Sequence, residues 1–588
     1  MAGGQHDAQG VPGRALDAST RELGFTPQPA VRWLAPGVLV ATGVKALLAT
    51  IFGAYADKRE LQGSLPSTVH GHGEGEVWFD FVADVGDGFD ATYSIATLLG
   101  RPQLDIPGAG PLPRGELLVM GGDQVYPAAS VQAYRDRTKG VYAAALPQAD
   151  GQRPTIYALP GNHDWYDGLT AFLRVFGQRR PIGGWDTAQT RSYFAVELPH
   201  RWWLYAIDTQ FDDHIDAPQL AYFTDAAQRL REGDTVILCT PSPSWINAHT
   251  QEGSESWDMI EFFNTEIVRP AGASIRVMLS GDKHHYSRYV EHDGGRQKLT
   301  CGLGGGYLTT TDELPDSVVL PPPTTRIRAA GPSTRFDLAG RYPDEQQSKR
   351  FAAGILRLPL RNPGFWGVAG LIQSVIVLAV LFGLAGPFGD RERGFFALVA
   401  SWTPAVLIAA LVVLGWLAFA RLDTRTTRLA GYVAGVLHAA VHLGLTLFWG
   451  LGITWLYRDV IPNDVLSNWV ALVLIVLALP AVLGFVHSEV VAVYLMVASR
   501  FGINLNELMA GQSIEDHKGF LRLHIDAGGT LRVYPIKVEK VCRSWAADPH
   551  GAPTDPLLRP NGFKLRPVMI EDPVVITQRD KTGAQRQM

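Results

Sequence analysis

The chain has 588 residues, a formal net charge of -5 and 46% hydrophobic residues, so it is too long for one ordinary domain and too balanced in charge to indicate nucleic-acid binding. Its three cysteines, Cys239, Cys301 and Cys542, stand far apart and form no CxxC pair. That spacing argues against a disulfide framework and against a thiolate zinc site. We therefore expect two or more domains in a reducing compartment.

The N-terminal region is polar and carries no secretory signal pattern, which predicts a disordered tail over residues 1–31. Residues 32–60 then contain an apolar stretch that Lys45 interrupts. We expect this stretch to form a helix that packs on the following domain or lies in a membrane interface, because a lysine near the centre of a bilayer is costly. A membrane-spanning helix over residues 33–55 stays open as an alternative.

Residues 61–311 alternate apolar strands with polar loops and helical stretches, a pattern typical of an α/β domain. Polar strings follow three of the apolar runs, at the carboxyl ends of predicted strands, where open α/β sheets bind ligands. Aspartate is rare in a protein interior unless it is paired or bound to a metal, so these side chains are predicted to converge on one site. The strings are Asp84-Val85-Gly86-Asp87, Gly122-Asp123-Gln124-Val125-Tyr126 and Gly161-Asn162-His163-Asp164.

Residues 312–361 are polar and rich in proline, which predicts a linker. Four long uncharged stretches follow, and each exceeds the roughly 20 residues that a helix needs to cross a bilayer. We therefore expect an α-helical four-span membrane domain over residues 362–500. Its predicted spans lie at residues 362–389, 394–420, 429–457 and 465–488.

The charges that flank these spans predict their orientation. Arginines such as Arg357, Arg425 and Arg500 are more frequent on the side that holds the 61–311 domain and the C-terminus than on the opposite side. Short cytoplasmic flanks carry an excess of positive charge. The bias therefore predicts an integral, multi-pass membrane protein with the 61–311 domain and the C-terminus in the cytoplasm.

Ionisable residues also occur within the last two predicted spans. His438 and His442 are four residues apart, hence on one helical face, while His487 and Glu489 are expected near the cytoplasmic end of the fourth span. Such residues are candidates for proton relay, metal binding or contact with lipid headgroups, and interhelical hydrogen bonding explains them equally well. We expect only that they face the interior of the bundle.

The C-terminal region, residues 501–588, contains alternating apolar residues at Leu521, Leu523 and Ile525, followed by a turn and a second strand. This pattern predicts a small β-hairpin region. A region so short should not fold alone, so we expect it to dock on the 61–311 domain.

The motif order in the 61–311 domain resembles that of the calcineurin-like metallophosphoesterases, and specifically the purple acid phosphatase variant. That variant carries DxG, GDxxY, GNH(D/E), a later histidine and GHxH. In this chain, Gly281-Asp282-Lys283-His284 corresponds to the last motif. The resemblance covers about residues 77–289. It implies a sandwich of two β-sheets flanked by helices, and hydrolysis of a phosphate ester by a hydroxide that metal ions activate.

The resemblance also implies one set of metal ligands and one set of catalytic residues. Asp123 would bridge two metal ions, and Asp84 and His284 would hold the first of them. His163 and Asp164 would act in catalysis, since an imidazole that titrates near neutral pH suits protonation of a leaving oxygen. The full set of implied metal ligands is Asp84, Asp123, Tyr126, Asn162, Asp282 and His284.

Two positions depart from the family pattern. Where the family has a histidine after the fifth strand, this chain has Thr240-Pro241, and Asp282 replaces the first histidine of GHxH. The first metal site is therefore expected to be intact and the second to be altered. Oxygen ligands favour Mn²⁺ or Mg²⁺ over Zn²⁺, so we expect divalent ions, Mn²⁺ or Fe. The residues that could complete the site are His285, His249, His214 and Asp87.

These observations predict a membrane-anchored phosphoesterase that acts on a phosphomonoester, a phosphodiester or a pyrophosphate, with a lipid-linked phosphate as one option. Its expected partners are the phosphate-ester substrate and the lipid bilayer, without a nucleic-acid-binding surface. The alternative is a sensor that binds metal or a phosphorylated ligand without turnover and signals to the membrane bundle. A transporter or channel is a weaker third class, because four spans with few charges show no evident pathway.

Overall fold

The computed structural model divides into two compact units. The globular unit comprises Met1–Val31, Ala41–Glu345 and Ser513–Met588, and the helical unit comprises Arg32–Val40 and Gln346–Gln512. Within them, the structure describes residues 15–16, 23–52, 58–209, 214–250, 256–383, 403–420, 428–456, 460, 468–548 and 550–578.

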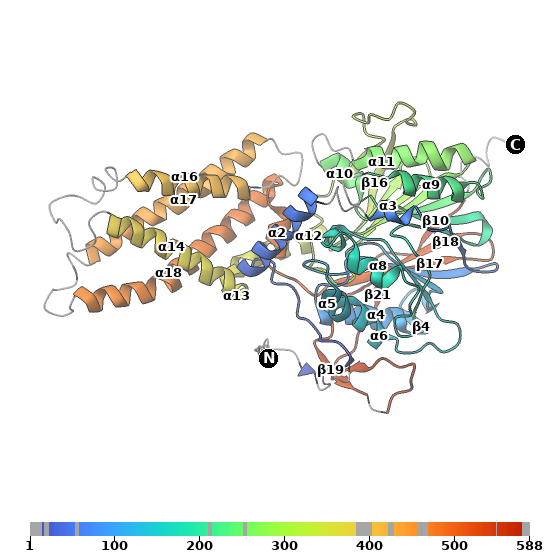
Figure 1. Cartoon of the computed structure of the whole chain (residues 1–588), viewed down its shortest axis with the longest axis horizontal. Coiled ribbons are helices and arrows are strands. Elements are labelled where there is room, and N and C mark those ends of the chain that lie inside the picture. Colours follow the sequence, from blue (N-terminus) through green and yellow to red (C-terminus); the bar gives the residue numbers. More distant parts are fainter. Residues whose placement is uncertain are drawn as a thin grey trace. The chain divides into compact units, whose positions relative to one another are not determined.

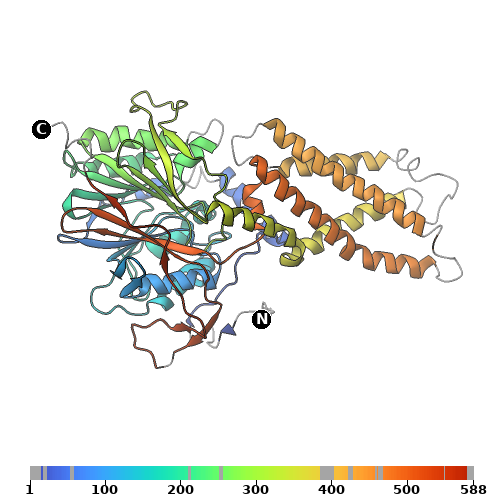
Figure 2. The same ribbon diagram turned by 180° about the vertical axis from the view of Figure 1, so that it is seen from behind.

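Two large β-sheets form the centre of the globular unit (Figures 1 and 2). One has nine strands in the order β15-β16-β13-β14-β12-β11-β10-β9-β2, with a parallel centre made of β10, β11, β12 and β14. Parallel strands are buried on both faces, which explains their continuous apolar runs in the sequence. The nine strands are β2 (Val69–Gly71), β9 (Phe194–Glu197), β10 (Trp202–Ala206), β11 (Thr235–Cys239), β12 (Ser274–Ser280), β13 (Tyr286–Glu291), β14 (Gln297–Cys301), β15 (Ser317–Leu320) and β16 (Thr334–Tyr342).

The other large sheet has eight strands in the order β21-β18-β17-β3-β6-β7-β8, and β22 also pairs with β18. Strands β3, β6, β7 and β8 are parallel, whereas β17 runs antiparallel to β3. The C-terminal hairpin β17–β18 is therefore an integral part of this sheet. The strands are β3 (Val77–Val82), β6 (Leu117–Met120), β7 (Thr155–Ala158), β8 (Asp186–Thr187), β17 (Lys518–Ile525), β18 (Leu531–Val538), β21 (Val568–Met569) and β22 (Val574–Ile576).

Helices cover each sheet (Figure 1). The core on one side joins α9, α10 and α11 to β10 and β11, and the core on the other side joins α4 and α6 to β3, β6 and β18. This arrangement confirms the expected α/β architecture of two sheets flanked by helices. The helices of the unit are α3 (Arg59–Gln62), α4 (Phe89–Gly100), α5 (Val131–Tyr134), α6 (Gly140–Ala145), α7 (Asn162–Trp165), α8 (Thr170–Phe176), α9 (Ala217–Ala227), α10 (Ser244–Thr250) and α11 (Ser256–Phe263).

The proline-rich region is not the linker that the sequence predicted over residues 312–361. Strands β15 and β16 lie within it and extend the nine-stranded sheet, where β16 pairs with β13. Phe336 of β16 is buried in the core, and the three prolines at 321–323 lie in the connection between the two strands. Proline cannot donate to a strand ladder, so its abundance marked the connection and hid the strands beside it.

The predicted N-terminal tail is also partly ordered. β1 (Ala15–Leu16) pairs in parallel with β19 (Ser544–Ala547), which in turn pairs with β20 (Leu558–Pro560). Phe25 is fully buried and contacts Phe89 of α4. The remaining residues of the tail, 1–14 and 17–22, lie outside the described part of the chain. A further small sheet pairs β4 (Gln103–Ile106) with β5 (Gly110–Pro113).

In the helical unit, three helices are long and apolar enough to cross a membrane, over Pro363–Leu381, Leu429–Trp455 and Val473–Phe501. Pro404–Phe419 is a shorter apolar helix, and residues 394–402 of the second predicted span lie outside the described residues. The three long helices indicate a membrane protein. The helices are α12 (Glu345–Ala353), α13 (Leu358–Arg361), α14 (Pro363–Gly383), α16 (Thr403–Phe419), α17 (Arg428–Trp455), α18 (Asn468–Ala498) and α19 (Leu505–Ala510), and α2 (Pro36–Phe52) forms in the expected apolar stretch.

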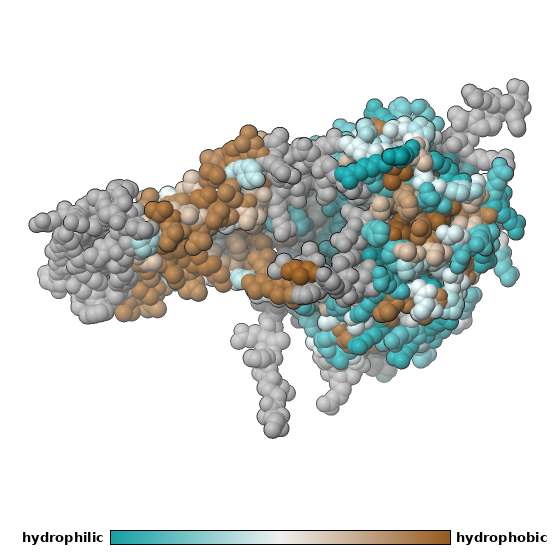
Figure 3. Space-filling view, turned by 45° about the horizontal axis from the view of Figure 1, so that its top comes forward, coloured by the Kyte–Doolittle hydropathy of each residue, from teal (hydrophilic) through white to brown (hydrophobic). Residues whose placement is uncertain are grey.

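The outer surface of these helices is apolar, as the brown atoms over the described helices show (Figure 3). Leu411, Leu437 and Leu477 expose 69%, 62% and 72% of their surface. Apolar surface on this scale fits contact with lipid. Inside the bundle, a Cβ atom added at Gly370 of α14 would lie 1.9 Å from the Pro480 carbonyl oxygen of α18. Small residues therefore let these two helices approach closely, as is common in membranes.

Candidate functional site

Three aspartates follow strands from both large sheets of the globular unit. Asp84 follows β3, Asp123 follows β6 and Asp282 follows β12. All three have a left-handed backbone, with φ angles of 60°, 50° and 68°. A left-handed residue other than glycine costs about 1–3 kcal/mol and persists at functional sites because the surrounding structure holds it. The three strained turns therefore mark this end of the sheets as the candidate site.

The hydroxyl group of Tyr126 lies where the predicted metal ligands meet. It is 3.0 Å from Asp84 Oδ1, 3.2 Å from Asp123 Oδ2 and 3.0 Å from His284 Nε2. The two carboxylates come from one sheet and His284 comes from the loop after β12 of the other sheet. The structure thus brings together four of the residues that the sequence selected.

The donor set and the charge of this cluster suit a divalent cation. Burial and the neighbouring carboxylates of Asp123 and Asp282 raise the pKa of Asp84 well above its usual range. Buried acids without a counterion are costly, and oxygen and imidazole donors are ligands of Mn²⁺ and Fe. As they stand, no three His, Cys, Asp or Glu side chains among the described residues form a complete cage for one ion. The residues fit a cation in donor type and charge, with Tyr126 at the centre of the cluster.

His163 lies against this cluster. Its backbone N–H donates to Asp123 Oδ1 over 3.0 Å, and its ring contacts the ring of Tyr126 at 4.6 Å between centroids. Nδ1 lies 2.7 Å from the Pro127 carbonyl oxygen, which places the proton of the neutral ring on Nδ1 and the lone pair on Nε2. Burial lowers the pKa of His163 to about 4, so the ring is neutral at neutral pH.

Asn162 and Asp164 share the loop and short helix α7 with His163. The side chain of Asp164 accepts hydrogen bonds from the backbone of Gly161, at 2.8 Å, and of Gln124, and from the hydroxyl of Tyr134. Asp164 therefore joins the loop of Gly161 to the loop of Gln124. A Cβ atom added at Gly161 would lie 2.1 Å from Asp123 Oδ1, so only glycine lets the Asn162 loop approach Asp123 this closely.

Pro241 and Asp282, the two positions that depart from the expected motif pattern, lie near the cluster. A Cβ atom at Gly122 would lie 3.7 Å from the Pro241 carbonyl oxygen, so the loop after β11 brings a backbone carbonyl close to the loop of Asp123. The backbone N–H of Asp282 donates to Asp84 Oδ2 over 3.0 Å, and its carboxylate lies 3.3 Å from Lys283 Nζ. The carboxylate of Asp282 is thus near the cluster and already paired with a lysine.

The additional candidates have other contacts. Nδ1 of His285 lies 3.1 Å from the Thr309 hydroxyl, and Asp87 Oδ1 accepts from the backbone of Val31 over 2.7 Å. His214 is exposed and His249 lies in α10. Asp87 therefore anchors the N-terminal segment beside the first site loop.

A glycine-rich loop at residues 302–306 completes the site, and the sequence reasoning missed it. The N–H of Gly306 donates to the Asp84 carbonyl over 2.7 Å, and a Cβ atom at Gly302 would lie 2.3 Å from Asp84 Oδ2. The loop can therefore hold the Asp84 turn only because residues such as Gly302 lack a side chain. The detectable signal was the Gly-Leu-Gly-Gly-Gly run directly after β14.

The C-terminal segment supports this glycine loop from behind. The N–H of Leu308 donates to the Ile514 carbonyl over 3.1 Å, and the N–H of Gly519 donates to the Leu303 carbonyl over 2.9 Å. Between them, Lys518 is completely buried and donates to the Asp516 carbonyl over 3.0 Å. Burial lowers the pKa of Lys518 to about 8. The segment therefore brings a positive group whose charge acts on His284 and Asp87.

Comparisons with known proteins add no assignment to this geometry. No protein-family model matches the chain, and no curated protein matches it. The interpretation of the site therefore depends on the residues that converge at Tyr126.

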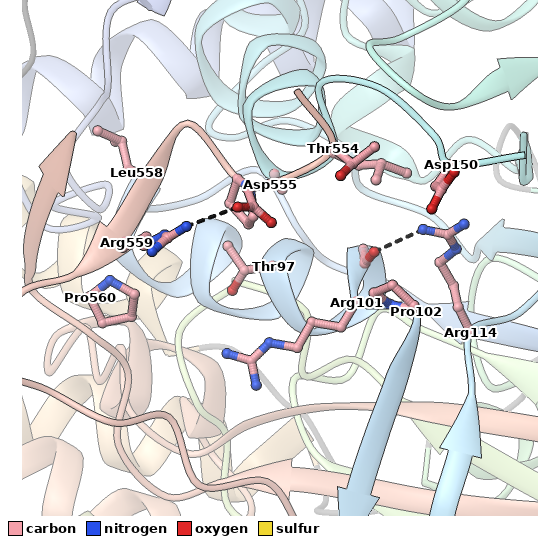
Figure 4. Close-up of a pocket in the computed structure, with 14 residues that line it drawn as sticks. Thr97, Arg101, Pro102, Arg114, Asp150, Thr554, Asp555, Leu558, Arg559 and Pro560 are labelled. Carbon is pink, nitrogen blue, oxygen red and sulfur yellow. Dashed lines mark hydrogen bonds and ion pairs between the residues drawn. The ribbon is translucent and has the colours of Figure 1, made fainter. Parts of the chain in front are cut away.

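A cavity of about 420 Å³ lies elsewhere in the globular unit, between the end of α4 and residues 554–560 (Figure 4). None of the cluster residues lines it. Two of its arginines are engaged, because Arg559 pairs with Asp555 at 2.8 Å and Arg114 donates to the Gly100 carbonyl over 3.0 Å. The cavity is separate from the candidate site.

The acidic cluster makes stability depend on pH and on cations. Burial, and then the charge of Asp282, raise the pKa of Asp123 from 3.8 to about 8. Between those values the folded protein holds a proton that the unfolded chain has released, so the free energy of unfolding falls as pH rises. A divalent cation can replace that proton. We expect Mn²⁺ to raise Tm more at about pH 8 than at about pH 5, measured by scanning fluorimetry of the detergent-solubilised chain.

Two comparisons make this measurement specific. Asp123→Asn should reduce the pH dependence of the Mn²⁺ effect, whereas Asp105→Asn at an exposed position of strand β4 should leave it unchanged. A Mn²⁺ effect of equal size at both pH values would contradict the electrostatic interpretation of the cluster.

Proposed function

We propose that the globular unit is a metal-dependent phosphoesterase anchored to a membrane, and that it hydrolyses a phosphomonoester, a phosphodiester or a pyrophosphate. The observation that carries the proposal is the convergence of Asp84, Asp123 and His284 on the Tyr126 hydroxyl from the strand ends of two sheets. Bound divalent cations would neutralise the phosphate oxygens and activate a water molecule. The family resemblance of the four motifs supports the same chemistry.

Different side chains would bind the cations and transfer the proton. Asp84, Asp123 and His284 would hold the first cation, and Asn162 with Asp282 would contribute to the second. His163 is fixed by its Nδ1 contact with Pro127, so Nε2 is the nitrogen that exchanges a proton. A phosphate anion beside this ring raises its affinity for a proton, and the proton can then pass from Nε2 to the leaving oxygen.

The long apolar helices favour one class of substrate. A site tethered to a bilayer meets lipid-linked phosphates at a high local concentration, which favours that substrate class over a soluble ester. The arginine bias of the flanking segments favours a cytoplasmic site.

A specific observation favours a second function, a sensor that binds metal or a phosphorylated ligand without turnover. Pro241 stands where the family has a ligand, and the carboxylate of Asp282 is paired with Lys283. A weak second metal position lowers the capacity to activate water more than the capacity to bind a ligand.

The experiment that separates the two functions is a hydrolysis assay on the full chain. p-Nitrophenyl phosphate and bis-p-nitrophenyl phosphate are supplied with Mn²⁺, Fe²⁺, Mg²⁺ or Zn²⁺. We expect turnover with Mn²⁺ or Fe²⁺, and a decrease of about 10²- to 10³-fold in kcat for His163→Ala, because a positioned proton donor contributes that much. His550→Ala, at an exposed position of the same unit, is the matched control.

Each outcome decides between the functions. Turnover that depends on His163 supports the enzyme. Tight Mn²⁺ binding by the wild type without turnover of either ester supports the sensor. Equal turnover by the wild type and by His163→Ala would show that the hydrolysis does not come from this site.

A further inference from the structure

Three histidines form a continuous chain in the interior of the helical unit. His442 Nε2 lies 3.0 Å from His438 Nε2, and His442 Nδ1 lies 2.6 Å from His487 Nδ1. The central ring of His442 thus uses both nitrogens, one toward its neighbour on α17 and one toward α18. The three side chains expose 3%, 2% and 1% of their surface. The three histidines therefore form one hydrogen-bonded row of imidazoles.

The row lies at the middle of two predicted membrane spans. His442 is the midpoint of Leu429–Trp455, and His487 is the midpoint of Val473–Phe501. With a rise of 1.5 Å per residue, His442 lies roughly 20 Å from each end of its helix. The sequence placed His487 near the cytoplasmic end of a span that ends at residue 488, whereas α18 continues to Ala498. Ionisable groups at this depth are functional candidates by default.

We propose that the His438–His442–His487 chain conducts protons across the centre of the bundle. A neutral imidazole carries one N–H and one lone pair, so a row of three can pass a proton from ring to ring. A proton binds at His438 Nδ1, and His438 releases its Nε2 proton to His442 Nε2. His442 then releases its Nδ1 proton to His487 Nδ1, and His487 releases its Nε2 proton at the far end. One proton enters and one leaves, and the net charge of the row is unchanged.

The two ends of the row support conduction over a purely structural role. His438 Nδ1 and His487 Nε2 are buried and have no hydrogen-bond partner among the described residues. Leaving buried polar atoms unpaired is costly, and a proton donor at one end and a proton acceptor at the other would pair both nitrogens. Open nitrogens at both ends are the positions where a proton donor and a proton acceptor must bind.

Aromatic faces enclose the row and stabilise the charged form that occurs during transfer. The ring of Trp416 on α16 stacks on His442 at 4.6 Å and 9°, and the ring of Tyr494 stacks on His438 at 3.9 Å and 13°. An imidazolium over an aromatic face gains cation–π attraction, which is larger away from water. Glu489 is not part of this row, although the sequence grouped it with the histidines.

The test is proton flux through the full chain in liposomes of neutral phospholipid. A potassium gradient with valinomycin sets the membrane potential, and trapped pyranine reports the internal pH. We expect the wild type to exceed protein-free liposomes by about tenfold or more, and His442→Gln to return flux to background, because glutamine forms hydrogen bonds but cannot take up and release a proton. His438→Gln should do the same, since the rings act in series.

The matched control is Thr454→Ala, which removes a hydroxyl that bonds to the Gly450 carbonyl within the same helix. This variant should conduct like the wild type. Elution volume and Tm of each variant report whether the bundle still folds. Wild-type flux at the level of protein-free liposomes, or full flux in a folded His442→Gln variant, would overturn the proposal. Saturable Zn²⁺ binding that His442→Gln abolishes, without proton flux, would assign the row to a metal site instead.

Discussion

Asp123→Asn is expected to lower the hydrolysis of p-nitrophenyl phosphate by about 10³-fold or more in the presence of Mn²⁺, which corresponds to about 4 kcal/mol of lost transition-state stabilisation. Asp123 lies between the Tyr126 hydroxyl and the backbone N–H of His163, so it faces both halves of the site. Asparagine keeps the shape and an oxygen acceptor for His163. It loses the negative charge that two cations would share.

Metal analysis separates the loss of cations from the loss of the fold. We expect fewer Mn²⁺ ions per chain in Asp123→Asn, together with an unchanged elution volume. Asp105→Asn carries the same chemical change at an exposed position of strand β4 and should retain both activity and metal. Wild-type kcat at saturating Mn²⁺ in Asp123→Asn would refute the assignment of the bridging carboxylate.

Arg522→Met is expected to destabilise the globular unit by about 3–5 kcal/mol, because it leaves a buried charge without its partner. Arg522 of β17 lies directly opposite Asp80 of β3, and Nε and Nη2 contact the two carboxylate oxygens at 2.8 and 3.0 Å. Both side chains are almost completely buried. Urea unfolding followed by tryptophan fluorescence measures the change.

The double variant Asp80→Leu with Arg522→Met tests this cause. Removing both charges avoids an unpaired carboxylate, so the double variant should be more stable than Arg522→Met alone. Arg229→Met removes one partner of an exposed ion pair and should cause no measurable change. An Arg522→Met variant that unfolds within about 1 kcal/mol of the wild type would show that β17 does not depend on this pair.

Local patterns in the sequence predicted each apolar strand and the polar site residues that follow it. The apolar runs that become β3, β6 and β7 are recognisable because strands in a parallel sheet are buried on both faces. Each is followed by its polar string, and the structure places Asp84, Asp123 and His163 in these loops. The glycine run at residues 302–306 carried a comparable signal, since consecutive glycines after a strand indicate close backbone approach.

Contacts between distant segments could not be predicted from the sequence. Lys518 acts on His284 and Asp87 because β17 pairs with β3, although the long apolar helices separate these strands along the chain. Strands β15 and β16 were hidden within a proline-rich region for a related reason. Strand pairing is decided by partners elsewhere in the chain, which composition and periodicity do not record.

By itself, the sequence determined the α/β class of the globular unit, the presence of long apolar helices and the identity of the polar strings, because periodicity and composition are local properties. The tertiary structure alone decided that Asp84, Asp123 and His284 meet at one tyrosine hydroxyl, and that His438, His442 and His487 form one row. Both arrangements depend on which strands pair and which helix faces touch. These choices are set by the burial of apolar surface over the whole chain.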